Sequence, residues 1–362
     1  MTIEQSRWLN GLKPSPHLLC LILPVYAFSF LVSGPHPGWT ALYWVIPVWL
    51  TVLADLYSPQ VKKTTDASFT ADQFDAILYL LSALQFGNIA MLLIMASQLS
   101  WTTGNELFTT VCNLFAIKIV IGTSSSFSGI VVAHELIHRK QPHFKVLGRL
   151  LLTLECYEHF ATEHIRGHHR KVGTENDPAT AQLGESFQAF WRRTVPAQFK
   201  SAWRLENERL GLFTHRSPHR RFLQHHVVQG LLVECGLAVG IIWYFGPITL
   251  IAFAIQAYAA IHKLETVNYI QHWGLSQCTG NTGKQLSWDT DSWFTLYTLV
   301  GLSRHTDHHQ APTLPYPQLR HRSESPKLPY GYFAMVFFTV FLNNRYQDLA
   351  IKELESRGLT KA

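Results

Sequence analysis

The chain has 362 residues, of which 47% are hydrophobic and 13% aromatic, whereas only 15% are charged. Ordinary soluble domains carry roughly 25% charged residues, so this composition argues against a disordered chain and against a nucleic-acid-binding arm. The net charge of +6 and the 19 histidines are the features that need an explanation.

Cysteine chemistry does not explain the composition. The five cysteines lie far apart and form no C-x-x-C motif (Cys20, Cys112, Cys156, Cys235 and Cys278). Their spacing argues against a disulfide framework, a cysteine zinc site and an internal rubredoxin or iron–sulfur module.

Two apolar runs come first in the chain. Residues 14–54 include no Lys, Arg, Asp or Glu, and a Gly/Pro-rich turn at 33–38 divides them. A hydrocarbon core of roughly 30 Å needs about 20 helical residues, or fewer where the flanking residues thin the bilayer. The first run is therefore expected to form two short transmembrane helices joined by a turn.

The same pattern occurs twice more. Residues 76–105 are uncharged and 107–133 carry only Lys118, which predicts a second helical hairpin that turns near 101–106. A third hairpin is expected over 225–265, with Gly246 and Pro247 at its turn. The apolar run 330–343 is too short to span a bilayer and predicts an interfacial helix.

These patterns predict an all-α integral membrane protein with about six transmembrane helices and a cytoplasmic, histidine-rich helical cap. We expect transmembrane hairpins one and two over 1–133, a cytoplasmic histidine-box segment over 134–224, the third hairpin over 225–267 and a cytoplasmic cap over 268–362. The segment 139–226 holds 15 Lys and Arg against 8 Asp and Glu. Positive-inside bias places this segment in the cytoplasm, so membrane orientation explains the basic charge without a nucleic-acid partner.

Four histidine groups lie beside the predicted span ends on this cytoplasmic side. On a helix, positions i, i+3 and i+4 share a face, so the rings of one box can reach one metal ion. Together the groups supply nine candidate ligands: His134, His138, His164, His168, His169, His272, His305, His308 and His309. Two ions with four or five histidines each would use this set and leave positions open for oxygen.

The ligand type does not choose the metal, since imidazole suits iron, copper, zinc and nickel. The first box also matches H-E-x-x-H, in which His134 and His138 would bind zinc and Glu135 would act as the base of an intramembrane protease. That alternative needs one further ligand and gives no role to the histidines at 305–309.

Four motifs resemble those of the membrane alkane 1-monooxygenases and their xylene-monooxygenase relatives, within the membrane fatty-acid hydroxylase and desaturase superfamily. They are HELIHRK (134–140), EHIRGHH (163–169), NYIQHWGL (268–275) and LSRHTDHH (302–309). The flanking segments GTENDPATAQLGES (173–186) and PTLPYPQLR (312–320) are similar too, and the likeness spans about residues 70–345. The resemblance implies a six-helix fold and a cytoplasmic non-haem di-iron centre, with the nine histidines as iron ligands.

One position departs from the family pattern. Alkane hydroxylases usually carry Glu before the histidine of the third box, whereas this chain has Gln271, as the xylene monooxygenases tend to, followed after the histidine by Trp273. The resemblance therefore implies hydroxylation of an unactivated alkyl or aryl-methyl C–H bond with O2. Desaturation or oxidative decarboxylation of a fatty acid to a terminal alkene stays open as an alternative on the same site.

Further residues have expected roles around the metals. Glu135, Glu163 and Asp307 could orient imidazoles through hydrogen bonds, and His159 and His262 could do the same or be buried core histidines. Phe127, Ile130 and Val131 are candidates for a substrate channel. The chain has no flavin or nicotinamide fingerprint, so electrons are expected from a separate rubredoxin or ferredoxin with its reductase. Candidate docking residues for that donor are Arg166, Arg170, Lys171, Arg192 and Arg193.

Overall fold

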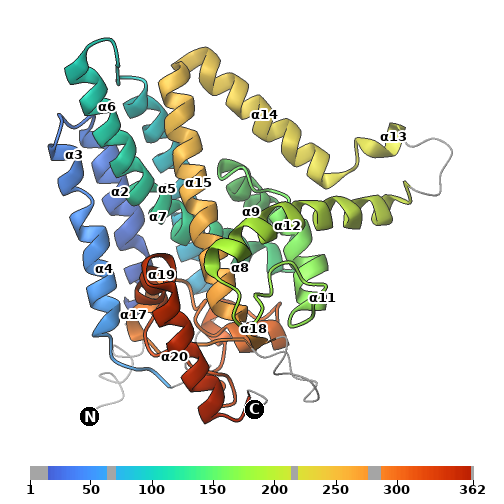
Figure 1. Cartoon of the computed structure of the whole chain (residues 1–362). Coiled ribbons are helices and arrows are strands. Elements are labelled where there is room, and N and C mark those ends of the chain that lie inside the picture. Colours follow the sequence, from blue (N-terminus) through green and yellow to red (C-terminus); the bar gives the residue numbers. More distant parts are fainter. Residues whose placement is uncertain (1–14, 63–70, 213–218, 276–286, 360–362) are drawn as a thin grey trace, which may run out of the picture.

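The computed structural model describes residues 15–62, 71–212, 219–275 and 287–359. All regular elements in these ranges are helices, which form one apolar bundle and a polar cap (Figure 1). The described cysteines are free thiols, and Cys278 lies outside the described residues. The protein is therefore an all-α integral membrane protein, as predicted.

Within the described residues, five helical stretches are long and apolar enough to cross a membrane: Pro16–Ser33, Phe74–Ala96, Gly104–His138, His226–Phe245 and Pro247–His272. The second predicted span is a shorter apolar stretch, Thr40–Leu56, which consists of α3 (Thr40–Tyr43) and α4 (Ile46–Leu56). The turn that precedes it contains the Gly34–Pro35 peptide bond in the cis form.

The spanning helices have the following bounds. The first consists of η1 (Ser15–Leu21) and α2 (Ile22–Ser33), and the third is α5 (Ala71–Ala96). The fourth is a continuous series of α6 (Gly104–Ala116), η2 (Ile117–Ile121), α7 (Gly122–Ser124), η3 (Ser125–Ile130) and α8 (Val131–His138). The last two are α14 (His226–Phe245) and α15 (Pro247–His272).

The fourth spanning helix differs from the others because η2 and η3 are π-helical. π-Helical turns shift the register of the side chains that follow them, and they occur frequently at functional sites. Close packing fixes this register at Gly122, where a Cβ atom would stand 2.4 Å from the Cβ of Ala259 on α15. The helix that carries the first histidine box is thereby held directly against the helix that carries the third.

A buried polar network crosses the same contact. Gln85 of α5 donates to the Ser125 hydroxyl (2.9 Å) and to the Glu155 carboxylate (2.8 Å), and Ser125 donates to Gln256 of α15 (2.8 Å). Satisfied polar groups in an apolar interior favour one arrangement over others, because each would be costly without its partner. This network thus fixes α5, η3 and α15 relative to one another.

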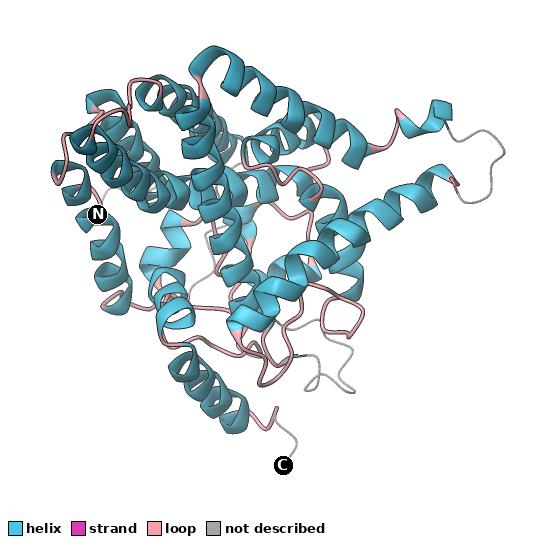
Figure 2. Cartoon of the chain, turned by 45° about the horizontal axis from the view of Figure 1, so that its top comes forward, coloured by secondary structure: helices cyan, strands magenta, loops and turns pink. Residues whose placement is uncertain are grey.

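The cap is made of the remaining helices. They are α9 (Pro142–Leu154), α10 (Phe160–Glu163), η4 (His164–His168), α11 (His169–Lys171), α12 (Phe187–Leu210), α13 (His219–Phe222), α17 (Trp293–Thr298), α18 (His305–Gln310), η5 (Tyr316–Gln318), α19 (Tyr332–Phe341) and α20 (Asn343–Ser356). In Figure 1, α17, α18 and α20 lie at the lower end of the bundle, whereas α12 and α13 project to its right. Figure 2 shows α12 and α14 extending together beyond the rest of the bundle.

The cap is fastened to the N-terminal half by Asp55, which lies near the end of α4. Its carboxylate accepts hydrogen bonds from Ser292 (2.6 Å), Thr295 (2.9 Å) and the backbone N–H of Ala334 (3.2 Å). The last contact places the first turn of α19 against α4. The run 330–343 thus forms a helix, as predicted, while its interfacial position stays a prediction.

Candidate metal centre

The nine predicted ligands fall into two groups in space. The first group is His134, His138, His164, His169 and His308, and the second is His168, His272, His305 and His309; within each group the candidate ligand atoms all lie within 4.8 Å of one another. The groups are adjacent, since the rings of His169 and His309 have centroids 4.5 Å apart. No predicted ligand lies outside them.

Helix geometry explains how the boxes are shared. On α8, His134 and His138 are one turn apart and both belong to the first group, with ring centroids 5.0 Å apart. The π-helical η4 brings His164 and His169, five residues apart, onto one face, with their Nε2 atoms 3.1 Å apart. His168 on the same turn points into the second group instead.

The fourth box is divided in the same way. On α18, His305 and His309 are one turn apart, with Nε2 atoms 3.1 Å apart, and both contribute to the second group. His308 contributes to the first group, where its Nε2 atom lies 3.2 Å from that of His169. Both η4 and α18 therefore bridge the two groups. The sequence placed His272 after the third predicted hairpin. In the structure it lies on the last turn of α15.

The surroundings of these rings fit metal ions. In the described part of the chain, the buried Nε2 atoms of His134, His138, His168 and His272 have no hydrogen-bond partner, and such orphaned polar atoms are rare in protein interiors. Two imidazole nitrogens that bind one ion at right angles, each about 2.1 Å from it, would be about 3 Å apart, which matches the observed nitrogen pairs.

Protonation also favours ligation. Burial lowers the pKa of His164, His169, His305, His308 and His309 well below its ordinary value, so these rings are neutral. A neutral imidazole is the form that binds a metal. His168 is the exception: burial opposes its protonation, but Asp177, together with Glu163 and Glu265, raises its pKa.

Asp177 is the site residue that the sequence analysis missed. Its carboxylate lies 2.9 Å from Nδ1 of His168 and also accepts from the Thr180 hydroxyl (2.6 Å) and the Ala179 N–H (3.1 Å). A carboxylate on the far nitrogen fixes the tautomer and orientation of a metal-binding imidazole. The available signal was an acid followed by Pro178, eight residues after the second box.

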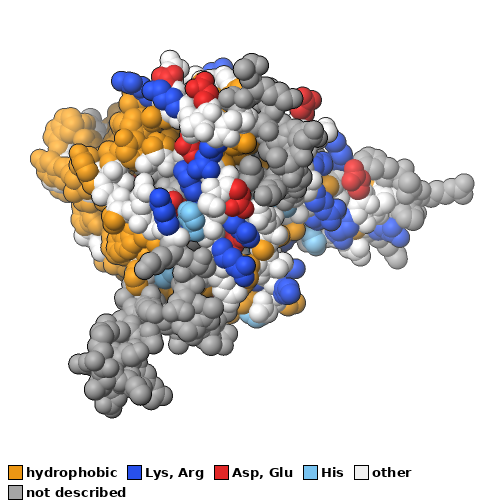
Figure 3. All heavy atoms as spheres, turned by 90° about the horizontal axis from the view of Figure 1, so that it is seen from below, with side chains coloured by type: hydrophobic (Ala, Val, Ile, Leu, Met, Phe, Trp, Pro, Cys, Tyr) orange, Lys and Arg blue, Asp and Glu red, His pale blue; other side chains and the backbone are white. Residues whose placement is uncertain are grey.

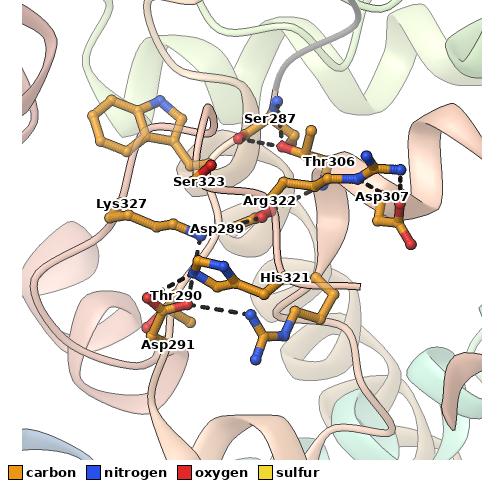
Figure 4. A network of polar contacts seen from close by, with 12 residues as sticks. Ser287, Asp289, Thr290, Asp291, Thr306, Asp307, His321, Arg322, Ser323 and Lys327 are labelled. Atoms are coloured by element: carbon orange, nitrogen blue, oxygen red, sulfur yellow. Dashed lines mark hydrogen bonds and ion pairs between the residues drawn. The ribbon is translucent and has the colours of Figure 1, made fainter. Parts of the chain in front are cut away.

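A second polar network holds α18 in place (Figure 4). Asp289 accepts from the backbone N–H of Thr306 (2.9 Å), and the Thr306 hydroxyl bonds to the backbone carbonyl of Ser287 (2.8 Å). Asp307 accepts from Arg322 Nε (2.7 Å) and the Arg320 N–H (2.7 Å). These bonds fix the helix that supplies ligands to both groups.

Two of the three acids predicted to orient imidazoles, Glu135 and Asp307, have other partners. Glu135 accepts from Arg139 (2.8 Å) and the Tyr316 N–H (3.2 Å), and Asp307 is occupied as described above. A glutamate held in this way is poorly placed to act as the base of a zinc protease. Glu163 is fully buried, and burial raises the pKa of its carboxyl to about 8.

The two additional histidines lie against aromatic rings, outside both ligand groups. His159 packs between Tyr157 and Phe199, and burial lowers its pKa to about 4. His262 packs against Trp191, with ring centroids 5.0 Å apart. The position of His159 matches the alternative of a buried core histidine, whereas His262 is half-buried and lines a cavity.

The predicted channel residues lie on the fourth spanning helix, in η3 and at the start of α8. Phe127 lines a cavity of about 310 Å³ between α4, the fourth spanning helix, α15 and α19. One turn further on, Val131 lines a much smaller cavity beside His134, His305 and His308. Ile130 is buried in the core, 1% exposed.

The predicted docking residues differ in their availability. Arg166 pairs with Glu206 (2.5 Å) and Arg193 with Glu185 (2.9 Å). Arg170 and Arg192 are exposed, Lys171 is half-buried, and none of the three forms an ion pair with a described residue. Figure 3 shows Lys and Arg side chains spread over the lower face of the molecule, while hydrophobic side chains gather on its left.

Comparison with known proteins shows similarity over the part of the chain that carries the histidines. The family model described as "Fatty acid desaturase" matches residues 110–339, which include all nine histidines. The chain is 37% identical over 227 residues to "Alkane 1-monooxygenase 1" of Pseudomonas aeruginosa, an alignment that covers 60% of this chain and 57% of the relative. It is 36% identical over 261 residues to "Alkane 1-monooxygenase" of Acinetobacter baylyi, covering 68% and 63%.

The chain thus spans less than two thirds of the length of these two relatives. A longer alignment exists with "Alkane 1-monooxygenase 2" of Pseudomonas aeruginosa, at 32% identity over 346 residues, which cover 93% of this chain and 91% of the relative. The chain therefore belongs to the fatty acid desaturase family and, within it, to the group of the alkane 1-monooxygenases.

Proposed function

We propose that this protein is a membrane di-iron monooxygenase that hydroxylates a terminal alkyl or aryl-methyl C–H bond of an apolar substrate. The observation that carries the proposal is the convergence of nine histidines into two adjacent groups. The names of the relatives support an alkane-type substrate. One atom of O2 enters the product and the other leaves as water, with two electrons and two protons consumed.

Two iron ions held by the two groups would supply the oxygen activation. The residues of the chain have other tasks. Asp177 orients His168, and the network around Asp289 holds α18. The apolar lining by Val131, Leu302 and Leu319 keeps water away from the histidines, which protects a reactive centre from side reactions.

The site is proposed to face the cytoplasm of a bacterial inner membrane, with electrons from a rubredoxin or ferredoxin and its reductase. The surplus of basic residues in 139–226 supports this orientation. The unpaired Arg170 and Arg192 are the strongest docking candidates, because an acidic carrier would meet no competing carboxylate there.

Product analysis tests the reaction. Cells that express the chain with a donor system would be fed an alkane, a methylarene and a free fatty acid side by side under labelled dioxygen. Hydroxylation leaves the label in the organic product, whereas desaturation and decarboxylation do not. About two irons per chain are expected, and a single zinc would contradict the proposal.

Docking is tested by charge reversal at Arg170→Glu with Arg192→Glu. Reduction of the enzyme by its carrier should slow about three- to tenfold at low salt, and the difference should shrink as salt rises. Arg345→Glu, a reversal on α20, is the matched control. An unchanged rate in the double variant would place the docking surface elsewhere.

A further inference from the structure

Two lysines lie inside the membrane-spanning part of the molecule. Lys118 is on η2, 14 residues into the helical stretch Gly104–His138, and Lys263 is on α15. By the rise of a helix, Lys118 lies about 21 Å from the start of its span and about 24 Å from His134. Charged residues at such positions are costly in a bilayer and usually functional.

Both lysines line the cavity of about 310 Å³ described above, which has Trp49, Phe127 and Phe333 among its apolar lining residues. No Asp or Glu is among the residues that line it, and Tyr258 and His262 are its further titratable rings. Lys118 is exposed and Lys263 is half-buried, and no described carboxylate pairs with either ammonium group. Two like charges that line one cavity of the spanning region therefore lack a counter-ion among the described residues.

The lining of the cavity comes within one helical turn of the metal centre. Phe127 and Phe333 both line the cavity and pack on each other, with ring centroids 4.7 Å apart. One turn beyond Phe127, Val131 lines the small cavity beside His134 and His308. Lys263 lies nine residues before His272, or about 14 Å along the helix. An alkyl chain that starts at the ammonium pair would therefore extend toward the histidines.

We propose that Lys118 and Lys263 bind the carboxylate of a single-chain fatty acid, whose alkyl tail occupies the cavity and presents its terminal methyl group to the metal centre. A cavity of this size is at the lower end of the range of pockets that hold small ligands, about 300–1,000 Å³, which favours one chain over a two-chain phospholipid. The inference rests on the proposed function and names a substrate class for it. The terminal C–H becomes C–OH, and the second oxygen atom leaves as water with the two electrons and two protons already stated.

Binding to the purified wild-type protein in detergent is the first test. Dodecanoate, dodecanol and phosphatidylglycerol would each compete with a spin-labelled fatty acid. Dodecanoate should compete about tenfold more effectively than dodecanol, because an anion between two cations gains most in a medium of low polarity. Equal competition by dodecanol, or displacement by phosphatidylglycerol alone, would overturn the proposal.

Variants locate the site. Lys118→Met with Lys263→Met should abolish the preference for dodecanoate over dodecanol, while Lys118→Arg with Lys263→Arg should retain it. Lys200→Met, on an exposed part of α12, is the matched control. A preference that survives in the double Met variant would refute the assignment. If the Met variant fails to fold, the wild-type comparison still decides.

Turnover separates this inference from the proposed function. With a donor system, dodecanoate should yield ω-hydroxydodecanoate, and dodecane should yield dodecanol. If dodecane is hydroxylated but dodecanoate neither binds nor reacts, the inference is wrong and the proposed function stands. If dodecanoate binds through the lysines but neither substrate gains labelled oxygen, the proposed function fails and the binding site stands.

Discussion

The first histidine group brings five rings together, whereas the second brings four, among them His168, whose Nδ1 lies 2.9 Å from the Asp177 carboxylate. All members of the second group are buried, while His169 of the first is half-buried. The two groups share η4 and α18, whereas α8 supplies rings only to the first group and α15 only to the second. The two groups thus differ in the number of their rings and in the carboxylate that holds His168.

The largest effect is expected from removing one ligand of either group. His138→Ala should leave the second ion in place and His309→Ala the first, so that metal content falls from about two ions to one per chain. Activity should fall more than about a hundredfold in both, because even partners of metal ligands are worth 10- to 100-fold. Elemental analysis with a product assay checks this, and His143→Ala on α9 is the control. Loss of both ions from either variant would mean that the groups are not separate sites.

Asp177→Asn should weaken metal binding by the second group only. The amide cannot accept a charge-assisted bond from His168, so affinity for the second ion should fall about 10- to 100-fold while the first is unaffected. Titration with a chelator, followed ion by ion, measures this. Glu185→Gln removes a carboxylate from an ion pair with Arg193 and serves as the matched control. An equal loss of both ions would contradict a role confined to the second group.

Asp289→Ala should instead affect both groups alike, since α18 serves both. It leaves the buried N–H of Thr306 without its acceptor, which costs about 1–3 kcal/mol of stability. Thermal unfolding in detergent should show a lower midpoint, and both ions should bind more weakly by a similar factor. Glu353→Ala on α20 is the milder comparison. It removes the acceptor of the part-buried backbone N–H of Lys327, in the loop before α19. A selective loss of one ion would show that α18 is held differently for each group.

The smallest expected effect is a difference between the two ions in the pH at which they are released. Asp177 and the neighbouring acids raise the pKa of His168, whereas burial lowers the pKa of His164 and His169 in the first group. A proton therefore competes with the metal at His168 at a higher pH, and the second ion should leave first as the pH falls. Metal retention by His138→Ala and His309→Ala across a pH series measures this order. Simultaneous release would show that Asp177 does not govern proton competition.

Much of the site could be foreseen because imidazoles at helical spacing are a local property. The boxes at His134 and His138 and at His305 to His309 predicted shared faces from spacing alone, and the structure places all nine rings in two groups. Spacing could not predict which ring of a box joins which group. The π-helical turn at His164–His168 moves His169 onto the face of His164, and no spacing rule indicates this turn. Asp177 was missed because its role arises from a loop that folds back onto His168.

The sequence by itself determined the helical membrane fold, because long uncharged runs are stable only where every backbone group is satisfied within a helix. It also supplied the histidine boxes that predict a metal site. Only the tertiary structure decided which ring joins which group, which acid holds His168 and that Lys118 and Lys263 line one cavity. These arrangements depend on contacts between residues far apart in the chain, such as Gly122 against Ala259, and no local pattern encodes them.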